Sequence, residues 1–326
     1  MREIIIEVND SNQRLDRFLN KYLPKAPKSL IQKYIRQKRI KLNKKRTKPD
    51  EMIFEGDRVQ LYIYEEVLQE YEEDKEALIY ENNLDIIYED KNIILMNKPS
   101  GKLSHAASRE DYGNNLVDDL ISYLILKGDF VPRVEKSFTP AISNRLDRNT
   151  SGLVIGCKNK DTLNKINSSI SKGLIKKYYL TITKGNLKTE TVNVNLQRVG
   201  KKTKVIKDKG KKSISKFHNL AYVDDYSLVE VDLITGRTHQ IRSHLQALGH
   251  PILGDGKYGD KVINEEFRRE FGLNRQLLHA YKIQFYGLDG QLEYLNGKSF
   301  RANPPKDFEI LGKEIFGDIY EDICEK

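Results

Sequence analysis

The segment 144–153 (NRLDRNTSGL) places one carboxylate, Asp147, between two arginines, Arg145 and Arg148. Turn-forming residues and then an apolar run follow it, so we expect a loop that presents Asp147 at the end of a buried strand, where catalytic groups often lie on a rigid base. The flanking cations favour the ionised carboxylate that a nucleophile requires. The structural alternative is a turn in which Asp147 caps local N–H groups and pairs with Arg145 or Arg148.

A second candidate residue, Tyr179, lies on a strand predicted over 178–183. Successive side chains of a strand point to opposite faces, which puts Tyr179 on the less apolar face with Thr181 and Thr183. We therefore expect its ring to be open to a ligand. The alternative is an ordinary half-buried tyrosine of a sheet.

A third candidate, Arg242, lies in the first turns of a helix predicted over 238–248, with Thr238 as N-cap and Gly249 just past its end. The buried face of this helix is predicted to comprise Ile241, His244, Leu245 and Leu248. Arg242 shares a different face with His239 and Gln246. The positive end of the helix favours an anion beside Arg242, either Asp147 or a phosphate. A plain surface arginine is the alternative.

Two patterns suggest sites that we do not expect to exist. The run GDGKYG at 254–259 satisfies G-x-G-x-x-G, but no long strand precedes it and no βαβ unit contains it, so we predict a loop. The spacing of His239, His244 and His250 fits no standard zinc pattern, and the helix turns the first two to different faces. We therefore expect no metal.

Four N-terminal segments form one pattern: QRLDRFL at 13–19, PKSL at 27–30, IKLN at 40–43 and EGDRV at 55–59. Together they resemble the S4 RNA-binding domain. An amphipathic helix over 13–23, a second helix opened by a capping box from Ser29 to Gln32, and strands at 40–43 and 58–64 account for the pattern. The resemblance implies that this domain holds structured RNA. The RNA-binding candidates are Arg14, Lys28, Lys33, Arg36, Lys44, Lys45 and Arg46.

Four further segments form a second pattern: NKPSG at 97–101, RLDR at 145–148, KKYYL at 176–180, and TGRTHQIRSH at 235–244 with GHPILGD at 249–255. In this order and spacing they closely resemble the RluA family of pseudouridine synthases. The resemblance extends from about residue 84 to 305. Together with the S4-like segment, YGD at 258–260 and GLNR at 272–275 make the chain most similar to the RluC-type branch, which acts on uridines of large-subunit ribosomal RNA.

The resemblance implies a role for each matching residue. Asp147 corresponds to the catalytic aspartate, Tyr179 to the tyrosine that stacks on the target base, and Arg242 to the arginine that pairs with the aspartate. Arg145 corresponds to the arginine that enters the RNA stack where the uridine has left. The family usually has His before Arg-Leu-Asp, whereas this chain has Asn144. We take that position to be supportive.

Making pseudouridine detaches uracil from C1′, rotates it and rejoins it through C5, so no redox partner or transferred group is needed. We therefore expect no cofactor. A carboxylate that bonds transiently to ribose or base, or that assists as the glycosidic bond breaks, suffices. The alternatives are a synthase acting on transfer RNA and a non-catalytic RNA-binding or ribosome-assembly factor.

The elements that must position these residues alternate between apolar strands and helices. The strand candidates are 93–96, 153–157, 178–182, 228–233 and 283–285, and the helix candidates lie near 115–126, 161–171 and 238–248. This pattern predicts an α+β fold on a mixed, largely antiparallel sheet with flanking helices, preceded by the small S4-like domain. We place the domains at 1–75, including an acidic connector, and 84–316. The lysine-rich stretch 198–216 is either an RNA-contacting loop or a solvated hairpin.

Charge and composition agree with a polyanionic partner, for which we predict large-subunit precursor ribosomal RNA. The formal net charge is +9, and residues 11–60 alone carry 15 Lys/Arg against 5 Asp/Glu, whereas residues 61–90 carry 1 against 11. Mean hydropathy is −0.62, and no run of about 18 apolar residues suggests a membrane span. Cys157 lies in an apolar run and is expected to be buried. We expect a cytoplasmic monomer.

Overall fold

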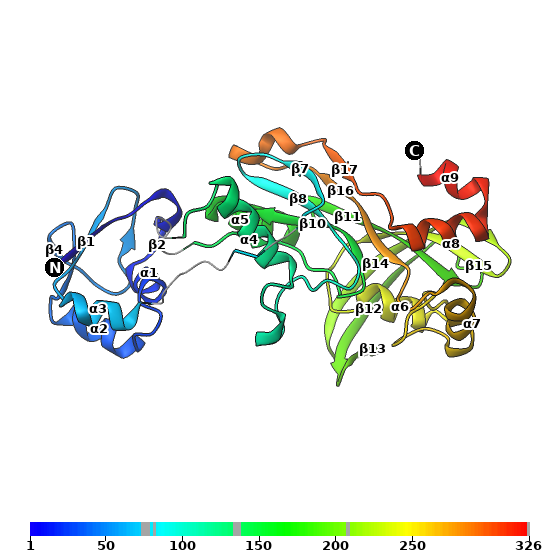
Figure 1. Cartoon of the computed structure of the whole chain (residues 1–326), viewed down its shortest axis with the longest axis horizontal. Coiled ribbons are helices and arrows are strands. Elements are labelled where there is room, and N and C mark those ends of the chain that lie inside the picture. The colour runs from blue at the N-terminus through cyan, green and yellow to red at the C-terminus, as the bar shows by residue number, and fades with distance from the viewer. Residues whose placement is uncertain (73–78, 81–82, 133–137, 207–208, 325–326) are drawn as a thin grey trace. The chain divides into compact units, whose positions relative to one another are not determined.

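The computed structural model describes residues 1–72, 79–80, 83–132, 138–206 and 209–324. The chain divides into two compact units (Figure 1). The smaller unit comprises Met1–Asn82, Asp119–Ala141 and Lys158–Leu163, and the larger comprises Asn83–Asp118, Ile142–Cys157 and Asn164–Lys326. The domain boundaries at 1–75 and 84–316 stay predictions.

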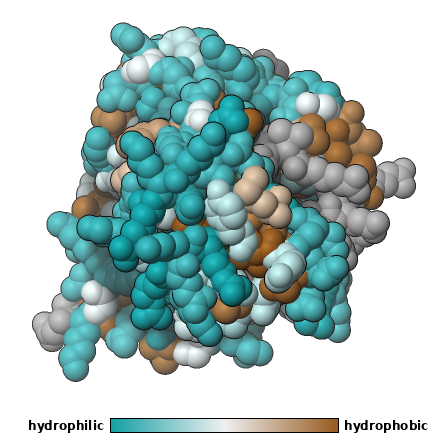
Figure 2. Space-filling view, turned by 90° about the vertical axis from the view of Figure 1, so that its left-hand side faces the viewer, coloured by the Kyte–Doolittle hydropathy of each residue, from teal (hydrophilic) through white to brown (hydrophobic). Residues whose placement is uncertain are grey.

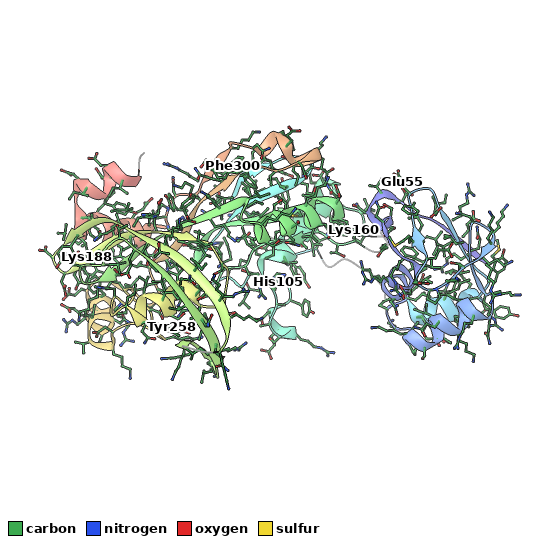
Figure 3. All side chains as sticks on the ribbon, turned by 180° about the vertical axis from the view of Figure 1, so that it is seen from behind. Glu55, His105, Lys160, Lys188, Tyr258 and Phe300 are labelled. Carbon is green, nitrogen blue, oxygen red and sulfur yellow. The ribbon has the colours of Figure 1, made fainter. Side chains whose placement is uncertain are left out.

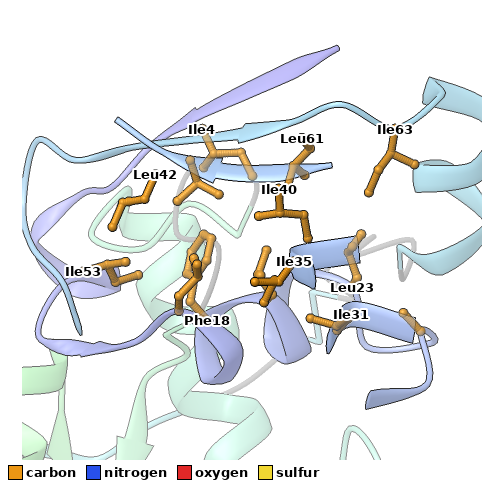
Figure 4. Packing of buried hydrophobic residues seen from close by; sticks show 14 of the residues in the cluster. Ile4, Phe18, Leu23, Ile31, Ile35, Ile40, Leu42, Ile53, Leu61 and Ile63 are labelled. Carbon is orange, nitrogen blue, oxygen red and sulfur yellow. The ribbon is translucent and has the colours of Figure 1, made fainter. Parts of the chain in front are cut away.

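A four-stranded antiparallel sheet, in the order β1-β6-β3-β4, organises the described part of residues 1–72. The strands here are β1 (Arg2–Ile5), β2 (Gln13–Arg14), β3 (Ile40–Leu42), β4 (Lys45–Arg46), β5 (Met52–Ile53) and β6 (Arg58–Leu61). The helices are η1 (Val8–Asp10), α1 (Leu15–Tyr22), α2 (Lys28–Arg36) and α3 (Glu65–Tyr71). Phe18 of α1, Ile35 of α2 and Leu61 of β6 belong to one apolar core (Figure 4). The pairing of β3 with β6 confirms the predicted strands at 40–43 and 58–64.

The first predicted helix begins later than expected. Gln13 and Arg14 pair with Ile53 and Met52 as strands β2 and β5, so α1 starts at Leu15. Its predicted apolar face is confirmed, because Leu15, Phe18 and Leu19 are buried.

The predicted capping box at Ser29 is wrong. The N-cap of α2 is Pro27, with φ −57°, and no side chain caps the helix. Proline is already fixed near a helical φ, so the helix starts directly after it and Ser29 falls within the first turn.

Part of the acidic connector is ordered structure. Residues 65–71 form α3, whose Leu68 is buried in the small core. The guanidinium of Arg2, on β1, donates hydrogen bonds to Glu65 and Glu72. These contacts attach the start of the acidic connector to the small apolar core and to Arg2.

The larger unit is built on an 11-stranded sheet whose main path is β13-β12-β14-β15-β11-β16-β10-β8-β7, with β17 beside β16 and β9 beside β10. Its strands are β7 (Ile86–Glu89), β8 (Ile93–Lys98), β9 (Ala141–Ile142), β10 (Ser151–Cys157), β11 (Ile175–Lys184), β12 (Glu190–Val199), β13 (Lys202–Ile206), β14 (Lys211–Val223), β15 (Tyr226–Leu233), β16 (Leu278–Phe285) and β17 (Ser299–Arg301). The helices that follow residue 83 are η2 (Arg109–Asp111), α4 (Leu116–Lys127), α5 (Lys160–Ser171), α6 (Gln240–Ala247), α7 (Lys261–Phe271), η3 (Gly290–Leu295), α8 (Lys306–Phe316) and α9 (Asp318–Cys324). Along the main path neighbours are antiparallel, except for the parallel pair β16 and β10. The predicted mixed, largely antiparallel sheet is confirmed.

The five predicted strands correspond to β8, β10, β11, β15 and β16, and the three predicted helices to α4, α5 and α6. The lysine-rich stretch 198–216 spans the end of β12, all of β13 and the start of β14. These strands extend beyond the rest of the larger sheet (Figure 1). The stretch is therefore a β-ribbon in its described part, which leaves its contact with RNA as a prediction.

A close approach of two strands fixes the end of the Asp147 loop. Gly152 of β10 has φ +115°, and a Cβ there would lie 2.3 Å from the Ala280 carbonyl oxygen of β16. Only glycine combines this φ with this spacing.

Hydrophilic side chains cover most of the face shown in Figure 2. Among the described residues, no helix combines the length and apolar character that a bilayer crossing requires. Cys157 is buried as predicted, and burial raises the pKa of its thiol to about 12.

Candidate active site

Asp147 lies in the loop between β9 and β10. Hydrogen bonds of the neighbouring residues Leu146 and Asn144, and not of the Asp147 side chain, hold this loop in place. The Ser104 hydroxyl donates to the Leu146 carbonyl (2.8 Å) and accepts from the Leu146 N–H (3.0 Å). The Asn144 amide donates to the Leu153 carbonyl and accepts from the Ile155 N–H. These bonds leave the Asp147 side chain 28% exposed at the end of β10. Asn144 is thus supportive, as predicted.

Arg242 is the cation that engages Asp147. Its Nη1 donates to Asp147 Oδ2 over 2.8 Å, whereas its Nε and Nη2 donate to the two oxygens of Asp255 over 2.7 and 2.8 Å. Burial alone lowers the pKa of Arg242, but the hydrogen bonds and charges of Asp255 and then Asp147 raise it overall above its ordinary value. No described residue donates a hydrogen bond to Asp147 Oδ1. One carboxylate oxygen is therefore held and the other is free.

The two flanking arginines form no ion pair with Asp147 in the part of the chain that the structure describes. Arg145 and Arg148 are exposed, and the Nε of Arg148 donates to the Gly101 carbonyl. The structural alternative, in which Asp147 pairs with either of them, is wrong. The reason is that both side chains turn to the surface on either side of the buried Leu146.

Helix α6 begins differently from the prediction and buries Arg242. Its N-cap is His239, in a left-handed conformation with φ 53°, and neither it nor Thr238 caps the helix with a side chain. Arg242 is only 5% exposed, although the helical periodicity placed it on a polar face. The segment around Asp255 covers that face and supplies the carboxylate that makes burial of the guanidinium tolerable.

Tyr179 is close enough to Asp147 for the carboxylate charge to raise its pKa, after burial as the larger cause. The expectation that its ring is open is wrong, because Tyr179 is 5% exposed. The segments around Ile252 and Leu277 cover the face of β11 that carries Tyr179. Ile252 forms an isolated β-bridge with Thr183, and the Leu277 carbonyl accepts a hydrogen bond from the Thr181 hydroxyl. The Tyr179 hydroxyl forms no hydrogen bond within the described part of the chain.

Lys98 is a further residue in the surroundings of Asp147. Lys98 is fully buried, and its Nζ donates to the carbonyls of Pro99, Lys102 and Arg148, which ties the segment after β8 to the Asp147 loop. Burial lowers the pKa of Lys98 to about 7, although the negative charge of Asp147 acts to raise it.

The family model described as RNA pseudouridylate synthase matches residues 92–247, and the S4 domain model matches residues 13–59. A protein of Mycoplasma capricolum named "Uncharacterized RNA pseudouridine synthase" is 33% identical over 319 residues, which cover 93% of this chain and 98% of the relative. The chain belongs to the RNA pseudouridine synthase family.

A second relative of this synthase is "Ribosomal large subunit pseudouridine synthase C" of Escherichia coli, 32% identical over 294 residues, which cover 86% of this chain and 88% of the relative. Among solved structures, "Human RNA Pseudouridylate Synthase Domain Containing 4" aligns with a TM-score of 0.53 at 22% identity, over 69% of this chain and 90% of that one. That structural likeness supports the fold. The predicted family and its isomerase activity are confirmed.

In the S4 domain of this synthase, six of the seven predicted RNA-binding side chains are exposed. They are Lys28, Lys33, Arg36, Lys44, Lys45 and Arg46. Arg14 differs, because its guanidinium is bound by Asp16 through Nε (3.1 Å) and Nη2 (2.7 Å).

Asp255, Tyr258 and His239 of the synthase were not predicted as site residues, although they lie in the family-like segments 249–255, 258–260 and 235–244. The run 254–259 is a loop, as predicted, yet it supplies Asp255 to Arg242 and Tyr258 to the same cluster. Across the described residues, no group of three His, Cys, Asp or Glu side chains is arranged to hold a metal ion.

Proposed function

We propose that this synthase isomerises uridines of large-subunit ribosomal RNA, with Asp147 as the catalytic carboxylate. The observation that carries the catalytic assignment is the pair of Asp147 with Arg242. One oxygen accepts from Nη1 over 2.8 Å, and the other has no partner among the described residues. The names of the relatives support the RNA class.

The reaction asks three things of the protein. The target nucleotide must leave its stack, at a cost of about a few kcal/mol. Tyr179 is covered in the free protein, so the RNA must first uncover its ring for the uracil to stack on it. One stacked base contributes roughly 1–3 kcal/mol, which offsets part of the cost of unstacking. The free oxygen of Asp147 must then lie beside the nucleotide, whether it attacks the ribose, attacks the base or assists elimination.

The remaining basic residues position the RNA rather than transform it. Arg145, exposed two residues before Asp147, can fill the space that the flipped uridine leaves. The S4 domain contributes phosphate contacts that set the register of the RNA without reading its sequence. We expect the synthase to act as a monomer in the cytoplasm, where ribosomal RNA is made.

Asp147→Asn tests the catalytic assignment. Arg242 keeps its two bonds to Asp255 in this variant, so we expect the fold and the RNA affinity to stay near those of the parent. Conversion of a ribosomal RNA fragment should fall to background. Asp225→Asn, at an exposed turn, is the matched control and should convert RNA at the parental rate. Conversion by Asp147→Asn near the parental rate would remove Asp147 from the mechanism.

The substrate class is tested separately, by mapping pseudouridines in ribosomal and transfer RNA from cells that lack the protein. We expect sites to disappear from large-subunit ribosomal RNA and to return with the wild-type gene. Loss confined to transfer RNA would contradict the proposed substrate and leave the catalytic assignment intact.

A further inference from the structure

Tyr258 lies under the Arg242–Asp147 pair without touching the carboxylate. Its side chain is 1% exposed, and its N–H donates to Asp255 Oδ1 over 3.0 Å. The Arg242 guanidinium lies 5.0 Å from the centre of its ring, and the ring of His239 meets it edge-on with centroids 5.5 Å apart. Figure 3 marks the position of Tyr258 in the larger unit. Packing on every side leaves this ring one orientation.

The hydrogen bonds of the Tyr258 hydroxyl have a defined direction. The backbone N–H of Thr203, on β13, donates to the oxygen over 2.6 Å, and a backbone N–H can only donate. Burial raises the pKa of Tyr258, while the backbone and side-chain hydrogen bonds of Thr203 lower it, as donors do. Among the described residues, His239 Nδ1, 2.9 Å away, is the other atom that bonds to this hydroxyl. A buried phenol proton without an acceptor costs free energy, so we assign this proton to His239 Nδ1.

This direction determines the tautomer of His239. Burial lowers the pKa of His239, with Asp147 raising it and Arg242 lowering it further, so the ring is neutral near pH 7. A neutral imidazole that accepts at Nδ1 carries its proton on Nε2. That Nε2 lies 3.8 Å from Asp147 Oδ2, too far for a direct hydrogen bond. The N–H is therefore free for an acceptor that arrives at Asp147.

We propose that His239 is a further substrate-binding residue of the synthase, whose Nε2–H donates to a carbonyl oxygen of uracil, and that Tyr258 is the residue that positions it. When the C1′–N1 bond breaks, its electron pair stays with the uracil, so negative charge spreads over N1 and the carbonyl oxygens. A fixed donor in a water-poor site stabilises such charge without giving up its proton. The His239 side chain is 14% exposed, so an inserted base can reach it. The inference rests on Asp147 as the catalytic carboxylate.

Substitutions in the full-length protein separate the donor from its support. His239→Leu removes the donor and should lower single-turnover conversion by about 10²-fold, the loss typical of one oxyanion donor, with the half-saturating RNA concentration unchanged. His239→Gln keeps an amide N–H near Nε2 and should recover at least about tenfold of that loss. Tyr258→Phe should lower turnover without weakening RNA binding. His218→Gln, on β14 outside the site, is the matched control.

Nitrogen NMR of labelled histidine tests the tautomer without substrate. We expect His239 as the Nε2–H form in the parent and a mixture of forms in Tyr258→Phe. An Nδ1–H form in the parent, parental turnover of His239→Leu, or no recovery in a folded His239→Gln would each overturn the inference. These outcomes can be distinguished from the outcome of the Asp147→Asn experiment. An inactive Asp147→Asn beside a fully active His239→Leu rejects the role of His239 alone, whereas an active Asp147→Asn rejects the catalytic assignment on which it rests.

Discussion

At the residue scale, Arg242 is oriented before any RNA arrives. Its planar guanidinium is bound on one edge by both oxygens of Asp255, so the direction of the remaining Nη1 is set by a residue that takes no part in the reaction. Asp147 then has one oxygen fixed by Arg242 and the other without a hydrogen-bond donor among the described residues. A lysine would supply the charge without this fixed direction.

Tyr179 offers a test of whether the site needs a hydroxyl or only a ring. Its pKa is raised by burial and then by Asp147, so the hydroxyl keeps its proton near pH 7. It can take the C5 proton only by passing its own on, and Asp147 is the carboxylate whose charge acts on it. We expect Tyr179→Phe to bind RNA normally and to turn over roughly 10²–10⁴-fold more slowly, measured in single-turnover assays.

Two further variants separate stacking from proton transfer. Tyr179→Leu should lose RNA affinity as well as turnover, because the ring is gone. Tyr178→Phe is the matched control on the opposite face of β11 and should behave as the parent. A Tyr179→Phe enzyme with parental turnover would leave the ring as a stacking platform only.

The residues that could be predicted from the sequence are those in recognisable motifs. Asp147 and Arg242 were named and the structure brings them together, although the sites themselves stay proposals. Asp255 was not singled out, although it ends the family-like segment 249–255, because a loop has no periodicity and its partner Arg242 is on a different element. The exposure of Tyr179 was misjudged because alternation describes one strand and says nothing of the loops that cover it.

At the scale of elements, the joint between β10 and β16 holds the Asp147 loop in place. We predict that Gly152→Ala lowers the free energy of unfolding by at least about 1–3 kcal/mol, because the added Cβ would lie 2.3 Å from the Ala280 carbonyl oxygen. The rate of RNA conversion should fall by more than the loss of folded protein explains. The reason is that β10 and β16 can separate only if the Asp147 loop moves. Chemical denaturation and single-turnover assays measure the two effects.

Gly173→Ala is the control for backbone strain alone. Gly173 also has a positive φ, +74°, but nothing lies within 4 Å of the Cβ that would be added. It should cost only the roughly 1 kcal/mol of a left-handed alanine and leave conversion unchanged. Equal effects of the two substitutions would show that the close approach does not matter.

Most elements could be predicted from apolar runs, but their ends could not. Strand β10 is buried along its whole length, which its apolar sequence indicates. The ends of α2 and α6 depend on Pro27 and on the left-handed His239, and the capping motifs predicted for both helices do not form. Strand β1 was missed because it pairs with β6, more than 50 residues away.

At the scale of the whole molecule, basic charge is concentrated where RNA contact is proposed. The three side chains Lys28, Lys33 and Arg36 are exposed along α2, and none pairs with a carboxylate in the part of the chain that the structure describes. Elsewhere, exposed cations do have such partners: Arg268 with Glu265, Arg269 with Glu270 and Lys313 with Glu321. Unpaired cations on one helix are the ones available to phosphates.

Replacing Lys28, Lys33 and Arg36 together by Gln should therefore weaken binding to ribosomal RNA and flatten its salt dependence. Each phosphate contact contributes about 0.7–0.9 to the slope of log affinity against log salt, so the loss of three should reduce the slope by about 2–3. Turnover of bound RNA should not change, because these residues lie outside the Asp147 cluster. The matched control replaces Arg268, Arg269 and Lys313 by Gln, which lowers the net charge equally but removes cations that carboxylates already hold. If both triple variants reduced the slope alike, overall charge rather than the S4 helix would be what holds the RNA.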